Sequence, residues 1–180
     1  MAELLTKNEV KRLITKVREL TRHIAALHAE DKLFSCIQYP KTPTVLTESI
    51  VYYLLMGKKI LPNVVFSELK FNVKASKHAN TKAGNTDIVG VVGTDEYLIE
   101  VKGSHSKFTQ FNSKDVASDC VIWVEFGSTF RSRTASISVA VIEKPALSGL
   151  TADKYTWESK KFAKLPKTEF AFSSIKSILG

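Results

Sequence analysis

The chain has little cysteine and no long apolar segment. Cys36 and Cys120 lack the spacing of a metal site and have no further cysteines to form a disulfide framework, so we expect reduced thiols in a cytoplasmic protein. The longest apolar run, Ile50 to Met56, is far too short to cross a bilayer, and we expect no membrane partner. The opening Met1-Ala2-Glu3 leads into charged residues, unlike the basic-then-apolar layout of a secretory signal.

Acidic residues are in the minority. The 180 residues contain 26 Lys and Arg against 18 Asp and Glu, which gives a formal net charge of +8. Clustered basic side chains favour a polyanionic partner such as nucleic acid, because binding releases the counterions condensed on the phosphates. A chain of this length with 44% hydrophobic residues can bury one core, and we expect a single domain over residues 1–180.

The first third of the chain predicts two helices. Thr6 and Glu9 have the spacing of a capping box, and apolar residues then recur at helical spacing to about residue 29. The second helix is expected over about residues 42–56. Pro43 suits its first helical position, either neighbouring threonine can cap it, and Gly57 ends it.

The remainder predicts strands separated by polar loops. β-branched runs indicate strands over residues 64–73, 86–92, 97–102, 120–126 and 135–142. Residues 74–85 form an expected exposed basic loop, and the polar stretch 104–119 has room for a short helix. The basic C-terminal tail, about residues 151–180, has no clear pattern. The fold class expected is therefore α/β, with a mixed central sheet flanked by helices and an extra N-terminal helix.

The most informative residues lie on an expected antiparallel hairpin. Gly93-Thr94-Asp95 is turn material between two β-branched runs. A two-residue loop at Thr94-Asp95 pairs Asp87 with Lys102 and places Glu100 on the same face as both, because side chains alternate along a strand. A three-residue loop places Asp87 on the opposite face unless a bulge restores it. The hypothesis therefore requires an even-length loop or a bulge.

Two carboxylates and a lysine on otherwise apolar strands suggest a catalytic role, because burying unpaired charge is costly. Asp87 and Glu100 offer the hard oxygen ligands that Mg²⁺ prefers, and Mn²⁺ can substitute for it. A bound ion lowers the pKa of a coordinated water and neutralises charge on a phosphate. Lys102 can orient the attacking water or stabilise the transition state. The alternative is a simple surface salt bridge between Glu100 and Lys102.

A second acid-x-lysine triplet, Glu68-Leu69-Lys70, also ends a strand-like run. No aspartate lies between Asp31 and this triplet, so it lacks the upstream acid of the hairpin. We therefore regard it as a look-alike of the catalytic pattern.

Thr86-Asp87, a short hairpin and Glu100-Val101-Lys102 resemble the PD-(D/E)XK nuclease superfamily, with Thr86 in place of the proline. The resemblance covers about residues 42–142 and implies a restriction-endonuclease-like α-β-β-β-α-β core. In that superfamily a preceding helix often carries a further metal-binding glutamate, and Glu48 occupies the matching place. The implied catalytic set is Asp87, Glu100, Lys102 and Glu48, with the three acids as metal ligands.

Polar segments flanking the hairpin are the expected DNA contacts. Lys and Arg suit phosphates, and Asn, Gln and Arg suit base edges. The candidates are Lys74, Lys77, Asn80 and Lys82 before the hairpin, Ser104, His105, Ser106, Lys107, Gln110 and Asn112 after it, and Arg131 and Arg133 in a later loop.

The sequence thus predicts a Mg²⁺-dependent endonuclease that cuts double-stranded DNA. The first expectation is a type II restriction endonuclease, usually a homodimer because two active sites must address two strands. A structure-specific nuclease such as a Holliday junction resolvase shares the core and the basic charge. An RNA-directed endonuclease with a similar core is a less favoured third candidate. A non-catalytic nucleic-acid-binding module is the alternative outside the enzymes.

Overall fold

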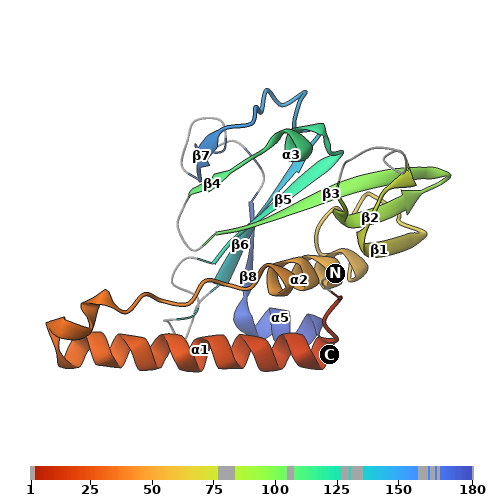
Figure 1. The fold of residues 1–180 in the computed structure, drawn as a ribbon. Coiled ribbons are helices and arrows are strands. Elements are labelled where there is room, and N and C mark those ends of the chain that lie inside the picture. Colours follow the sequence, from red (N-terminus) through yellow and green to blue (C-terminus); the bar gives the residue numbers. More distant parts are fainter. Residues whose placement is uncertain are drawn as a thin grey trace.

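The computed structural model describes residues 3–76, 84–104, 108–126, 130, 136–157, 162, 165 and 167–179. Its centre is a mixed six-stranded sheet with the order β1-β2-β3-β5-β6-β8 (Figure 1). Neighbouring strands run antiparallel except β3 and β5, which are parallel. The α/β class with a mixed sheet and flanking helices is therefore confirmed.

The strands agree broadly with the β-branched runs of the sequence. Two expected strands differ from their predicted bounds by more than one residue: the one at 64–73 begins only at Glu68, and the one at 97–102 extends in both directions. The extension of β3 has a cause, since its start pairs with β2 and its end with β5. The bounds are β1 Glu68–Val73, β2 Thr86–Val92, β3 Asp95–Ser104, β5 Cys120–Glu125, β6 Ser136–Glu143 and β8 Lys167–Ala171.

Helices α1 (Lys7–Glu30), α2 (Thr44–Met56) and α5 (Phe172–Ile178) lie on one side of the sheet (Figure 1). The capping box of Thr6 and Glu9 is present at the start of α1. The short 3-10 helix η1 (Lys32–Cys36) follows α1. Pro43 is the N-cap residue of α2 rather than its first helical residue, and no described side chain caps this helix. The predicted position of Pro43 was therefore wrong by one residue.

The other side of the sheet carries α3 (Ser113–Ala117) and a small sheet of β4 (Phe108–Gln110) and β7 (Lys154–Thr156) (Figure 1). Two apolar clusters follow this division. One joins α1, α2 and α5 to one face of the sheet, including Ile88, Ile99 and Val101. The other joins the opposite face, through Val121 and Trp123, to the segments around β4 and β7. Among the described residues, no helix is long and apolar enough to cross a membrane.

The hairpin has an even-length loop, as the nuclease hypothesis requires, but its register differs from the prediction. Val92 pairs with Asp95, so the two loop residues are Gly93 and Thr94 rather than Thr94 and Asp95. Gly93 has a φ of +63°, which suits glycine at the first central position of a tight hairpin turn. The predicted pairing of Asp87 with Lys102 was therefore wrong by two residues. Because the shift is even, the assignment of faces is unchanged.

Candidate active site

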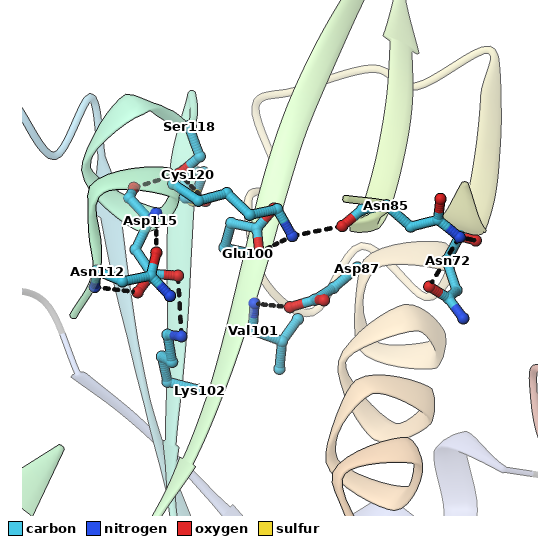
Figure 2. Close-up of polar contacts among 11 residues, drawn as sticks. Asn72, Asn85, Asp87, Glu100, Val101, Lys102, Asn112, Asp115, Ser118 and Cys120 are labelled. Atoms are coloured by element: carbon cyan, nitrogen blue, oxygen red, sulfur yellow. Dashed lines mark hydrogen bonds and ion pairs between the residues drawn. The ribbon is translucent and has the colours of Figure 1, made fainter. Parts of the chain in front are cut away.

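β2 and β3 separate at the point where the candidate residues lie. Their last pair is Ile88 with Ile99, beyond which β2 stays paired with β1 and β3 with β5. Continuing the same register sets Asp87 across from Glu100. The Asp87 carboxylate enters this fork, where its Oδ2 accepts a hydrogen bond from the Val101 N–H at 2.8 Å (Figure 2).

Glu100 and Lys102 point to the face of the sheet that α3 covers. Alternation along β3 separates them from Ile99 and Val101, which face the main core. Each makes an ion pair with the first turn of α3. Lys114 Nζ lies 2.8 Å from Glu100 Oε2, and Lys102 Nζ lies 2.9 Å from Asp115 Oδ1. Lys114 also donates a hydrogen bond to the backbone carbonyl of Asn85.

Asp115 fixes this turn of α3. Its backbone N–H donates to Asn112 Oδ1 at 3.0 Å, and its Oδ2 accepts from the Asn112 N–H at 2.6 Å, which completes a reciprocal capping box. The Asp115 side chain is fully buried, so Lys102 is the counter-charge of an otherwise solvent-free carboxylate. α3 is thereby held in a position that delivers Lys114 to Glu100.

Glu48 reaches the site from α2, on the opposite side of the sheet from α3. The residue is only 7% exposed. Within the described part of the chain, its carboxylate makes no hydrogen bond or ion pair. The charged groups that act on the Glu48 carboxylate are Asp87 and Lys114. Asp87, in the fork, thus lies between an acid from the helix face and an acid from the α3 face.

Burial raises the pKa values of all three carboxyls, and the charge of Asp87 raises those of Glu48 and Glu100 further. Burial, and then the charge of Asp87, raise the pKa of Glu48 to about 7, against the opposing effect of Lys114. The same two causes raise the pKa of Glu100 to about 7, again against Lys114. Burial raises the pKa of Asp87, which the hydrogen bond from Val101 opposes. A cation placed among these groups favours their ionised forms.

The donor set fits a hard divalent cation in its chemistry. Asp87 and Glu100 carry carboxylate oxygens, Asn85 offers a carbonyl oxygen, and Glu48 adds a carboxylate that has no partner among the described residues. These are the ligand types that Mg²⁺ takes. Among the described residues, no three acidic, histidine or cysteine side chains are gathered closely enough to hold a metal ion in this conformation. Coordination by all three acids stays a prediction.

The predicted DNA contacts differ in their structural environments. Lys74 and Gln110 are exposed, at the end of β1 and on β4. Ser104 is buried, and its hydroxyl accepts a hydrogen bond from the Trp123 indole at 2.8 Å, which favours a packing role. Asn112 serves as the cap of α3. The other candidates lie outside the described residues, namely Lys77, Asn80, Lys82, His105, Ser106, Lys107, Arg131 and Arg133.

The look-alike triplet on β1 has a different environment. Lys70 Nζ lies 3.2 Å from Glu68 Oε2, and the two side chains are 43% and 57% exposed. Exposed pairs of this kind contribute little to stability. The buried Glu100 and partly buried Lys102 differ from it in burial and in their partners.

Lys114, Asp115 and Asn85 are the site residues that sequence reasoning missed. The spacing of Asn112 and Asp115 is a capping signal that could have located the start of α3. No local pattern shows that the following turn meets β3, because that contact depends on how the chain folds back over the sheet.

Comparison with known proteins adds no relative. No protein-family model, no curated protein and no solved structure matches the chain. The resemblance to PD-(D/E)XK nucleases therefore stays a prediction, and the chemistry of the site follows from its own residues.

Proposed function

We propose that the protein is a Mg²⁺-dependent endonuclease that hydrolyses DNA phosphodiester bonds. The observation that carries the proposal is the convergence of Asp87 and Glu100 at the fork of β2 and β3, with Lys102 on the same face. The buried Glu48 approaches from α2. Four buried or half-buried charges at one break in a sheet are costly unless they serve a ligand or a reaction.

The order of elements supports a restriction-endonuclease-like assignment. α2 precedes the antiparallel β1, β2 and β3, and α3 leads into β5, which runs parallel to β3. This sequence of elements is the α-β-β-β-α-β layout expected for a PD-(D/E)XK nuclease. The long α1 lies outside that core. Within this class we propose a sequence-specific type II enzyme, cytoplasmic and homodimeric.

The residues have distinct roles in the proposed reaction. Asp87 and Glu100 would hold the divalent ion, with Glu48 as a further acid nearby. The ion supplies Lewis-acid stabilisation of the phosphate and a lowered pKa for a bound water. Lys102 directs its ammonium toward the attacked phosphate, and Asp115 keeps that ammonium in place. Of the predicted DNA contacts that the structure describes, the exposed Lys74 and Gln110 would contact the duplex.

A specific observation favours a second candidate, a nucleic-acid-binding module without cleavage. Glu100 is paired with Lys114 and Lys102 with Asp115, so the charges of β3 are compensated within the protein. Such pairs are able to serve a purely structural role. The basic net charge would then serve binding alone.

Incubation of the purified protein with supercoiled and linear DNA tests the proposal. Cleavage with Mg²⁺ that EDTA abolishes is expected, and discrete bands indicate sequence specificity. Preference for a four-way junction over linear duplex would redirect the assignment to a junction resolvase. Binding without any cleavage would favour the second candidate.

Variants locate the activity in the fork. Asp87→Ala and Lys102→Ala are expected to bind DNA without cutting it. The look-alike pair provides the matched control, because Lys70→Ala removes the lysine of an acid-x-lysine triplet that is exposed. Lys70→Ala should cleave at the wild-type rate. Full activity in either fork variant would refute the site.

A further inference from the structure

The Lys114 ammonium occupies a position that suits a metal ion. Its two partners are Glu100 Oε2, at 2.8 Å, and the carbonyl oxygen of Asn85. Both are hard oxygen ligands of the kind that Mg²⁺ and Mn²⁺ take. The charge of Lys114 also acts on Glu48 and, together with that of Lys102, on Asp87. One ammonium thus serves three carboxyl groups that come from three different elements.

The three carboxylates at the fork carry enough negative charge to bind more than one positive charge. Lys102 is engaged by the fully buried Asp115, so it does not compensate Glu100 directly. Lys114 acts on all three acids, and Lys102 acts in addition on Asp87. Glu48 is buried and has no hydrogen-bond or ion-pair partner among the described residues. A divalent ion in the place of the Lys114 ammonium would compensate the three carboxylates better than that single charge does.

Charge repulsion disfavours binding of a metal ion to the same oxygen that holds the Lys114 ammonium. An ion bound to Glu100 Oε2 would lie beside the ammonium, and two cations at that distance repel strongly at a partly buried site. The Lys114 ammonium can move away from Glu100 toward solvent, because the Lys114 side chain is 37% exposed whereas that of Glu100 is 4% exposed. Its long stem allows the ammonium to move into water while α3 stays in place.

We propose that Lys114 is a tethered cation that holds the place of the divalent ion in the metal-free protein and leaves Glu100 when that ion binds. The inference rests on the proposed function, because it concerns the same carboxylates. It gives Lys114 a regulatory role: the lysine compensates the site before metal arrives and lowers the apparent affinity for metal. The ion binds only by exchange with Lys114.

The direct test is Mn²⁺ binding to the full-length protein, measured by titration calorimetry near pH 8, which is above the pKa of about 7 of Glu48 and Glu100. Lys114→Gln is expected to bind Mn²⁺ about tenfold more tightly than the wild type, because the competing charge is gone. Lys114→Arg keeps the charge and should stay near the wild-type affinity. Lys70→Gln removes an exposed lysine of the same sheet and should leave the Mn²⁺ affinity unchanged. Unchanged or weaker binding by Lys114→Gln overturns the proposal.

A second measurement needs no variant. In a Mg²⁺ titration of the wild type followed by NMR, the side-chain signals of Lys114 should shift with the same midpoint as metal binding. Signals of Lys114 that stay unchanged at saturation overturn the proposal even if Lys114→Gln does not fold.

The outcomes separate this inference from the nuclease proposal. Tighter metal binding by Lys114→Gln without any DNA cleavage supports the exchange and refutes the nuclease. Metal-dependent cleavage with equal affinities in wild type and Lys114→Gln supports the nuclease and refutes the exchange. Absence of metal binding in both proteins refutes both.

Discussion

Asp87 Oδ2 accepts the hydrogen bond of the Val101 N–H across the fork between β2 and β3. The carboxylate thereby replaces the backbone acceptor that β2 no longer offers to β3. Asp87 thus has a structural task as well as its proposed chemical one. Substitutions at this position separate the two, because an amide can accept the same hydrogen bond without carrying charge.

Asp87→Asn should keep the fold and abolish cleavage. The amide oxygen still accepts from Val101, so we expect a free energy of unfolding within about 1 kcal/mol of the wild type. Asp87→Ala leaves the Val101 N–H without its acceptor and should cost about 1–3 kcal/mol. Urea unfolding and plasmid cleavage measure the two effects. Equal stability of the Asn and Ala variants would contradict the role of the hydrogen bond.

Stability should fall as pH rises through neutrality because of Glu48. Its pKa is about 7 in the folded protein against an ordinary value of 4.5, so the folded state holds the proton more tightly than the unfolded chain. The associated stability is full below about pH 4.5 and is lost as pH rises through about 7. Glu48→Gln removes the part of this loss that Glu48 contributes, whereas Glu100, whose pKa is also raised to about 7, keeps its own part. Near pH 8 the variant should melt at a higher temperature than the wild type.

The control for this pH effect is Glu68→Gln. Glu68 is exposed and paired with Lys70 on the same sheet. Its variant should show the same change of melting temperature between about pH 5 and pH 8 as the wild type. A Glu48→Gln variant that follows the wild-type pH dependence would show that Glu48 is not the responsible group.

Much of the hairpin could be predicted from local patterns. The β-branched run of β2 has the expected bounds, and the face shared by Glu100 and Lys102 follows from alternation alone. The loop position was wrong because Gly93, at the end of the run, takes the positive φ that the turn requires. The neighbouring threonine and aspartate were equally good turn residues by composition, so composition did not decide between them.

The ion pairs of the site could not be predicted in this way. Lys114 and Asp115 lie in a polar stretch whose only local signal is the capping box with Asn112. Their partners Glu100 and Lys102 are more than ten positions earlier in the chain. The pairing arises when the chain crosses from β3 to β5 and sets α3 over the sheet, which is a long-range consequence of strand order.

Asp115→Asn should destabilise the protein more than any substitution of an exposed ion pair. The fully buried carboxylate pairs with Lys102 and caps α3. Removing one charge of a buried pair leaves the other uncompensated, and we expect a loss of about 3 kcal/mol in urea unfolding. Glu68→Gln, in the exposed pair, should cost less than about 1 kcal/mol. Similar losses of unfolding free energy for the two variants would mean that burial does not make the Asp115 ion pair more important for stability than an exposed one.

Gly103→Ala tests the contact that sets α2, and with it Glu48, against β3. A Cβ at Gly103 would lie 2.9 Å from Thr47 Oγ1 and 3.2 Å from Thr47 Cγ2, and Thr47 is itself buried. We expect a loss of about 1–3 kcal/mol in urea unfolding, because a branched side chain in a packed core has little freedom to move. Thr47→Ala removes both clashing atoms, so Gly103→Ala should cost clearly less in that background. An equal cost in both backgrounds would show that Thr47 is not what keeps residue 103 small.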